Sequence, residues 1–197
     1  MITGHKSYLE PLSNHRNHLS TETKLLLEDC ELAIKIMVLF GIPPEEYYPY
    51  DITKFDDEPN AFSYAFAQSY QTINYYRLDQ TNISSTQLLE RVKNFLAAGY
   101  PSMFGFTVYN FGNDKGEFEF PGPGEAVQGG HAVVAVGYDD NRKIGKEKGA
   151  LKIRNSWGVS WGEGGDDWFP YAYVEGRLAD DFWRLFKAES VPTGQFE

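Results

Sequence analysis

The first part of the chain has the apolar spacing of helices, separated by polar or aromatic connections. The first predicted helix runs from Lys24 to Phe40, with Ser20 or Thr21 as its cap, because apolar residues recur at helical spacing: Leu25, Leu26, Leu32, Ile36, Leu39 and Phe40. Gly41 and the Pro43-Pro44 pair end this helix, since proline cannot continue it. An aromatic loop follows.

The pattern then changes twice before residue 100. Asn60 to Tyr70 is consistent with a short helix, and Thr72 to Asp79 alternates as a strand does. A second long helix is predicted to run to Ala98, capped by Ser85 or Thr86, with one apolar face: Leu88, Leu89, Val92, Phe95 and Leu96.

Four predicted strands dominate the second half: Ser102–Tyr109, His131–Tyr138, Ala150–Asn155 and Asp181–Ala188. A Gly/Pro-rich loop, 110–128, precedes the second of these strands, and a charged turn, Asp139–Lys148, is predicted to follow it. Helices first and an antiparallel sheet second indicate the α+β class.

Composition and charge exclude several kinds of protein. The 197 residues carry a formal net charge of −10, which disfavours a nucleic-acid partner because phosphate binding needs clustered cations. No stretch has the roughly 20 apolar residues of a membrane helix, and residues 1–20 contain no apolar leader. With one cysteine, no internal disulfide or multi-thiolate zinc site is possible, and a reducing, cytoplasmic location is favoured.

No metal or cofactor is expected. His15 and His18 lie three residues apart, and an exposed, loosely ordered segment explains them better than a metal site does. Nothing in the pattern predicts the oligomeric state.

His131 and Asn155 are the candidate chemical groups. The two strands around Asp139–Lys148 form an antiparallel hairpin, so the start of the first lies beside the end of the second. His131 would then neighbour Asn155, and a carboxamide can hold an imidazole in one tautomer for proton transfer near neutral pH. The alternatives are a histidine satisfied at a strand end and an asparagine closing a turn. The two glycines before His131 would allow a close backbone approach.

Trp157 follows directly and begins a glycine-rich loop. An indole packed over a His–Asn hydrogen bond would exclude water and strengthen it, although simple packing is the alternative. Unusual backbone angles are expected at the loop glycines: Gly158, Gly162, Gly164 and Gly165.

These segments resemble a known family. GGHAVVAVGYDD (129–140) and GALKIRNSWGVSWGEGG (149–165) resemble the histidine and asparagine segments of papain-like cysteine peptidases. GIPPEEYYPYD (41–51) resembles a loop of the family's N-terminal half, and WFPYAYV (168–174) and LADDFW (178–183) resemble the closing strands of bacterial members. The resemblance implies His131 as general base and acid, Asn155 as its orienter, Trp157 as a shield, and a peptide or protein substrate.

The resemblance also implies a division of the chain. Residues 1–23 are a polar N-terminal segment, either a tail or the remnant of a longer segment. Residues 24–197 are a partial papain-like domain, helical over about 24–100 and sheet over about 101–197.

The nucleophile segment of the family, of the type Gln-Gly-x-x-Gly-Ser-Cys at the start of a long helix, does not occur in this sequence. Cys30 is the only cysteine, but it lies inside a predicted helix among Glu28, Asp29 and Glu31, which would raise a thiol pKa. Its position 18 residues before Tyr48 is also too close to the 41–51 loop. Asp166-Asp167 departs from the family's glycine and aromatic, so the strand start is expected to be altered.

The expected parent activity is peptide-bond hydrolysis by a Cys-His-Asn site, with this chain inactive alone because a triad works as a unit. Three explanations of the missing thiol stand: a fragment whose central helix is encoded upstream or cleaved off, a complete non-catalytic module that binds peptides or a protein, and a split enzyme whose missing segment comes from another chain. An acyltransferase of the same site chemistry is a further alternative. Substrate preference is not readable.

Overall fold

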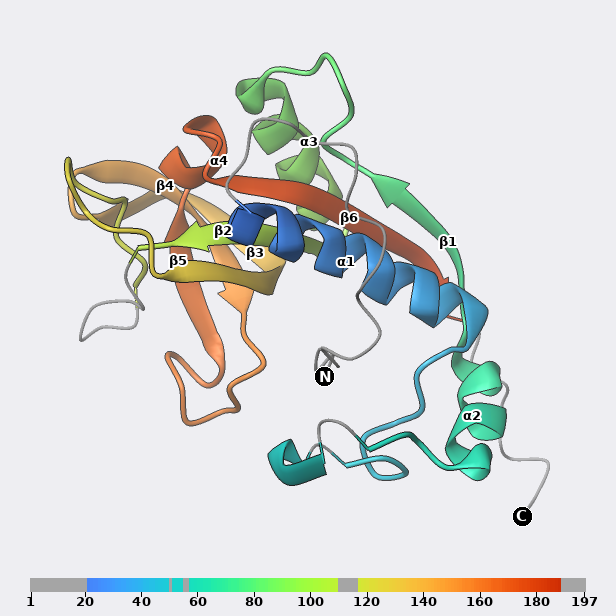
Figure 1. The fold of residues 1–197 in the computed structure, drawn as a ribbon. Helices are drawn as coiled ribbons and strands as arrows, with labels where there is room; N and C mark the ends of the chain where they lie inside the picture. The colour runs from blue at the N-terminus through green and yellow to red at the C-terminus, as the bar shows by residue number, and fades with distance from the viewer. Residues whose placement is uncertain (1–20, 50, 55–56, 110–116, 189–197) are drawn as a thin grey trace.

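Six strands of the described chain form one antiparallel sheet in the order β1-β6-β2-β3-β4-β5 (Figure 1). The computed structural model describes residues 21–49, 51–54, 57–109 and 117–188. In chain order the elements are α1 (Thr21–Leu39), a 3-10 turn (Ile52–Lys54), α2 (Ala61–Ala67), a second 3-10 turn (Gln68–Tyr70), β1 (Thr72–Arg77), α3 (Ser85–Ala97), β2 (Ser102–Val108), β3 (Gly129–Ile144), β4 (Glu147–Arg154), β5 (Asp166–Pro170), α4 (Ala172–Glu175) and β6 (Ala179–Ala188). The predicted α+β class is confirmed.

The helices match the apolar spacing, with one shift at a cap. Asn60 caps α2 by accepting a 2.8 Å hydrogen bond from the Ser63 amide on its Oδ1. At α3 the cap is Ser84, one residue before the predicted Ser85 or Thr86, because Gln87 bonds back to the Ser84 amide and completes a capping box. The predicted Ser20 cap of α1 lies outside the described residues.

The predicted charged turn at Asp139–Lys148 is wrong. β3 and β4 continue through most of it and are joined by a tight turn at Gly145 and Lys146, where Gly145 has φ 58°. The charged residues do not end the strands because this part of the hairpin extends past the core, where side chains reach water or pair. Arg142, for example, pairs with Glu117 at 2.8 Å.

WFPYAYV is only partly a strand. Its first half lies in β5, whereas Tyr171 to Gly176 turn through the short helix α4. The turn is needed because β5 is at one edge of the sheet and β6 lies between β1 and β2, so the chain must cross the sheet. Tyr171 is anchored at this crossing by its amide, which donates to the Gly149 carbonyl at 3.0 Å.

Helices cover both faces of the sheet (Figure 1): α3 and α4 lie on one face and α1 on the other. The larger core lies under α3, where Phe104 stacks on Phe182 at 4.5 Å and meets Phe169 at 5.4 Å. On the opposite face α1 places Cys30 and Ile34 against Trp183. Because side chains alternate along each strand, they divide between the face covered by α3, the α3 face, and the face covered by α1, the α1 face.

We predict that Phe104→Ala lowers the free energy of unfolding by about 3–5 kcal/mol, because Phe104 is fully buried and its loss leaves a cavity. Phe62→Ala makes the same chemical change at a side chain that is 60% exposed, so a loss of less than about 1 kcal/mol is expected. Urea unfolding of the two variants measures the difference, and equal losses would contradict the assigned core.

Candidate active site

The β3–β4 hairpin brings His131 and Asn155 together at one end of the sheet. Val134 pairs with Arg154 and Ala135 with Ile153, so the start of β3 lies beside the residue that follows β4. His131 Nε2 is 3.0 Å from Asn155 Oδ1, across 24 residues of sequence. The predicted juxtaposition is confirmed.

A backbone donor determines where the imidazole proton lies. The Ser156 amide donates to the same Asn155 atom at 2.8 Å, and an N–H can donate only to an acceptor, so that atom is the carbonyl oxygen. His131 Nε2 must therefore carry the proton that it shares with Oδ1. In the neutral ring Nδ1 then keeps its lone pair, which leaves it able to accept a proton from another group.

Four aromatic side chains surround the imidazole. Trp157 stacks on the His131 ring at 5.0 Å and 25°, and Phe106 meets the ring edge-on at 5.9 Å. Trp161 packs against Trp157 at 5.3 Å, and Phe118 joins Trp161 to Phe106 at 6.2 and 5.3 Å. Trp157 itself is 43% exposed, so one side of the indole covers the ring and the other meets solvent.

The loop that carries both tryptophans depends on its glycines. Gly158, Gly162, Gly164 and Gly165 all have positive φ, as predicted. At Gly162 a Cβ would lie 2.3 Å from the Asp166 carbonyl oxygen, so the loop folds back too closely for any other residue. The close approach predicted for the glycines before His131 is not found at Gly129, where a Cβ would meet nothing within 4 Å.

Burial and the Asn155 bond act on the His131 pKa in opposite directions. Burial among the aromatic rings has the larger effect and lowers the pKa below the ordinary 6.5, whereas the bond to Asn155 raises it. The net effect keeps His131 neutral at pH 7, which is the form that can accept a proton.

Cys30 lies on the other face of the sheet from His131. It is 2% exposed in the middle of α1, packed with Trp183, and Ala132 lies against that cluster. Ala132 points to the α1 face. His131, which precedes it in β3 and pairs with Phe106, points to the opposite, α3 face. The structure therefore does not bring Cys30 to the His131–Asn155 pair.

The strand that starts at Asp166-Asp167 is intact, contrary to expectation. Asp166 lies on the face opposite to Asp167 and pairs with Arg154 at 2.7 Å and Lys152 at 3.2 Å, which lowers its pKa. Asp167 is 1% exposed, and burial raises its pKa to about 7. Sequence reasoning treated Asp167 only as a departure from the family and did not identify Phe118, because the surroundings of both side chains depend on which strand packs against them.

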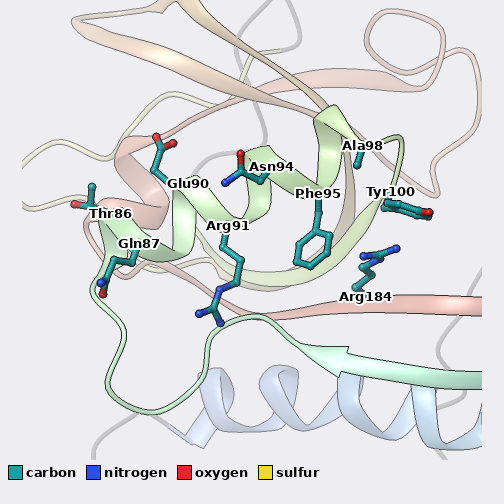
Figure 2. A pocket seen from close by; sticks show the side chains of 9 residues that line it. All are labelled: Thr86, Gln87, Glu90, Arg91, Asn94, Phe95, Ala98, Tyr100 and Arg184. Atoms are coloured by element: carbon teal, nitrogen blue, oxygen red, sulfur yellow. The ribbon is translucent and has the colours of Figure 1, made fainter.

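A pocket of about 550 Å³ lies away from these residues, between α3 and β6 (Figure 2). Arg184 is packed there against the rings of Tyr100 and Phe95, at 3.6 and 4.4 Å from their centroids. Within the described residues no cluster of three potential metal ligands occurs, and no helix there is long and apolar enough to cross a membrane. His15 and His18 lie outside these residues.

An antiparallel sheet that carries a His–Asn pair beneath an indole defines a papain-like protein. The model of the family described as papain family cysteine protease matches residues 30–173, which is most of the chain. The chain therefore belongs to the papain family of cysteine proteases.

Individual relatives agree with this assignment. An uncharacterized peptidase C1-like protein of Acanthamoeba polyphaga mimivirus is 34% identical over 157 residues, covering 76% of this chain and 49% of the viral protein. Xylellain, a cysteine protease from Xylella fastidiosa, is 32% identical with a TM-score of 0.62, covering 81% of this chain and 60% of xylellain. The protease and lectin-like domains of Cwp84 from Clostridium difficile share the fold at 18% identity and a TM-score of 0.61, over 82% of this chain and 36% of that one. The chain thus spans about half to three fifths of the two nearer proteins.

We predict opposite shifts of the His131 pKa in two variants. Asn155→Leu removes the bond that raises the pKa but keeps the site apolar, so the pKa falls further below 6.5. Trp157→Ala opens the ring to water and raises the pKa toward 6.5. NMR titration of His131 measures both, with exposed Val159→Ala in the same loop as control. Shifts of the same sign in the two variants would contradict the assigned causes.

We also predict that Asp167→Asn stabilises the fold at pH 8 by roughly 1–3 kcal/mol. The folded pKa of Asp167, about 7, exceeds the unfolded 3.8, so the folded state holds the proton longer and stability falls as pH rises from about 4 to 7. The asparagine variant lacks this fall. Asp79, whose pKa is also raised to about 7, is present in both proteins, so the Asp167 contribution is the difference between their curves.

Asp166→Asn is the matched control for this measurement. The pKa of Asp166 is lowered, so its pairing stabilises the fold above the unfolded pKa and is lost as pH falls. The control therefore loses stability at pH 8. Chemical denaturation between pH 4 and 8 checks both signs, and a loss of stability at pH 8 in Asp167→Asn would contradict the prediction.

Proposed function

We propose that this chain provides the histidine and asparagine of a cysteine peptidase site that hydrolyses peptide bonds. The observation that carries the proposal is the 3.0 Å bond from His131 Nε2 to Asn155 Oδ1, which leaves Nδ1 as the proton acceptor. Membership of a peptidase family supports protein or peptide substrates.

In this proposal each residue has one role. Nδ1 of His131 takes the proton from a thiol, the thiolate attacks the peptide carbonyl, and the same nitrogen gives the proton to the leaving amine. A water molecule, deprotonated by His131, then hydrolyses the thioester and regenerates the thiol. Asn155 holds the ring in one tautomer and stabilises the imidazolium, and Trp157 keeps water from their bond.

The thiol in this proposal is not that of Cys30. A nucleophile must reach both His131 Nδ1 and the substrate carbonyl, whereas Cys30 is buried on the α1 face of the sheet. We propose that the thiol comes from a polypeptide segment other than these 197 residues, in keeping with the partial coverage of the relatives. The chain alone is then inactive.

The first test uses the chain as it is. A fluorogenic peptide amide is expected to show no turnover above the uncatalysed rate, and Cys30→Ala is expected to behave identically. Turnover that is lost in both Cys30→Ala and His131→Ala would overturn the assignment of the thiol. Peptide binding without hydrolysis, measured as a change in tryptophan fluorescence that Trp157→Phe abolishes, would favour the non-catalytic module instead.

A second test supplies the thiol. A segment with the family's Gln-Gly-x-x-Gly-Ser-Cys pattern is fused ahead of Thr21, and hydrolysis of the same peptide is measured. His131→Ala in an active fusion is expected to lower kcat/KM by about 10³-fold or more, and Asn155→Leu by less, because an orienter acts only through the base. Activity that survives His131→Ala would contradict the proposed role.

A further inference from the structure

Asn155 and Asp167 lie on the same face of the β4–β5 ladder. Ile153 pairs with Asp167, Leu151 with Phe169, and the Asn155 amide donates to the Gly165 carbonyl at 3.0 Å, so the pairing continues beyond β4. Side chains directly opposite in an antiparallel pair share a face, and here that face is the buried α3 face. Asn155 and Asp167 are therefore diagonal neighbours, with Cα atoms roughly 7–8 Å apart.

The Asn155 carboxamide is only half satisfied. Its oxygen accepts two hydrogen bonds, from His131 Nε2 and the Ser156 amide. Its nitrogen, Nδ2, is buried and has no hydrogen-bond partner within the part of the chain that the structure describes. A buried NH₂ group without an acceptor costs about 1–3 kcal/mol, so an acceptor is expected near it.

Asp167 carries an acceptor that is equally unsatisfied. Its Oδ1 accepts the Trp168 amide at 2.6 Å, but Oδ2 is buried and bonded to nothing among the described residues. The neighbouring cation, Arg142, pairs with Glu117 at 2.8 Å and lies over the Trp168 ring, and its charge lowers the Asp167 pKa less than burial raises it. No ion pair of Asp167 occurs in the described ranges, so Oδ2 remains available to a donor on its own face.

We propose that Asp167 is a positioning residue, whose carboxyl holds the Asn155 carboxamide through one buried water molecule. When Asp167 is ionised, the water accepts from Asn155 Nδ2 and donates to Asp167 Oδ2, which satisfies both atoms across a diagonal separation too long for a direct bond. The inference rests on the proposed function, since it concerns the pair that would perform proton transfer.

The consequence is control of the amide orientation. A carboxamide turned by 180° would present Nδ2 to His131 and require the opposite imidazole tautomer. The Ser156 amide opposes this rotation at the oxygen, and the bridge to Asp167 opposes it at the nitrogen. Nδ1 of His131 thereby stays the proton acceptor.

The test compares imidazole nitrogen-15 shifts of His131 in the full chain. Asp167→Leu removes the acceptor and fills the same buried space, at the cost of the hydrogen bond from the Trp168 amide. We expect this variant to show mixed tautomers, seen as the Nδ1 and Nε2 shifts moving toward each other. Asp167→Asn keeps the carbonyl that accepts the Trp168 amide but puts an NH₂ group where Oδ2 was, so this nearly isosteric variant is also expected to lose the bridge and show mixed tautomers.

Asp166→Asn is the matched control, because it changes the adjacent aspartate on the opposite face and leaves the wild-type tautomer. Wild-type shifts in Asp167→Leu or in Asp167→Asn, or equal mixing in the Asp166→Asn control, would each overturn the proposal. A purely structural role would change unfolding temperatures without this dependence on the acceptor.

A measurement on the unmodified chain decides the matter if Asp167→Leu does not fold. The Asn155 NH₂ protons are expected to exchange slowly with solvent and to show a nuclear Overhauser effect to a long-lived water. Rapid exchange would overturn the bridge. Neither measurement needs a thiol, so an inactive fusion would count against the proposed function alone, and a failed bridge would count against Asp167 alone.

Discussion

The register between β3 and β4 is the constraint on which the site depends. Val134 opposite Arg154 places His131 beside Asn155, although a long hairpin separates them in sequence. Because side chains alternate along a strand, a slip of one residue would turn Asn155 away from the imidazole. The buried α3 face holds the register, since the same slip would expose Leu151 and Ile153.

The site is a polar continuation of an apolar face. Phe104 and Phe106 share the α3 face with His131, which pairs with Phe106. Leu151 and Ile153 lie on the same face in β4, ahead of Asn155. Burial at the end of this face lowers the His131 pKa, whereas burial of Asp167 raises the pKa of a carboxyl. Both shifts favour the neutral forms, as expected where water is largely excluded.

The two faces of the sheet carry different candidate groups: Cys30 packs on the α1 face, and His131 lies on the α3 face. Papain-family membership is carried by residues 30–173, and the first of these, Cys30, belongs to α1 and packs against Trp183. A cysteine in a protease family is an obvious candidate nucleophile, yet α1 covers the face of the sheet opposite to the one on which His131 lies. Position in the sequence is therefore a poor guide to its role, and the face it occupies is a better one.

Local patterns in the sequence were sufficient for the α+β class, the positions of most helices and strands, and the pairing of His131 with Asn155. These depend on periodicity and hairpin geometry, which act over short stretches. Tertiary structure alone decided that Phe118, in a Gly/Pro-rich loop, packs between Phe106 and Trp161 beside the His131 site. Tertiary structure also decided that the charged residues after Tyr138 extend a strand. It also decided which of two adjacent aspartates lies on the α3 face, because the face depends on the pairing with the partner strand and not on residue type.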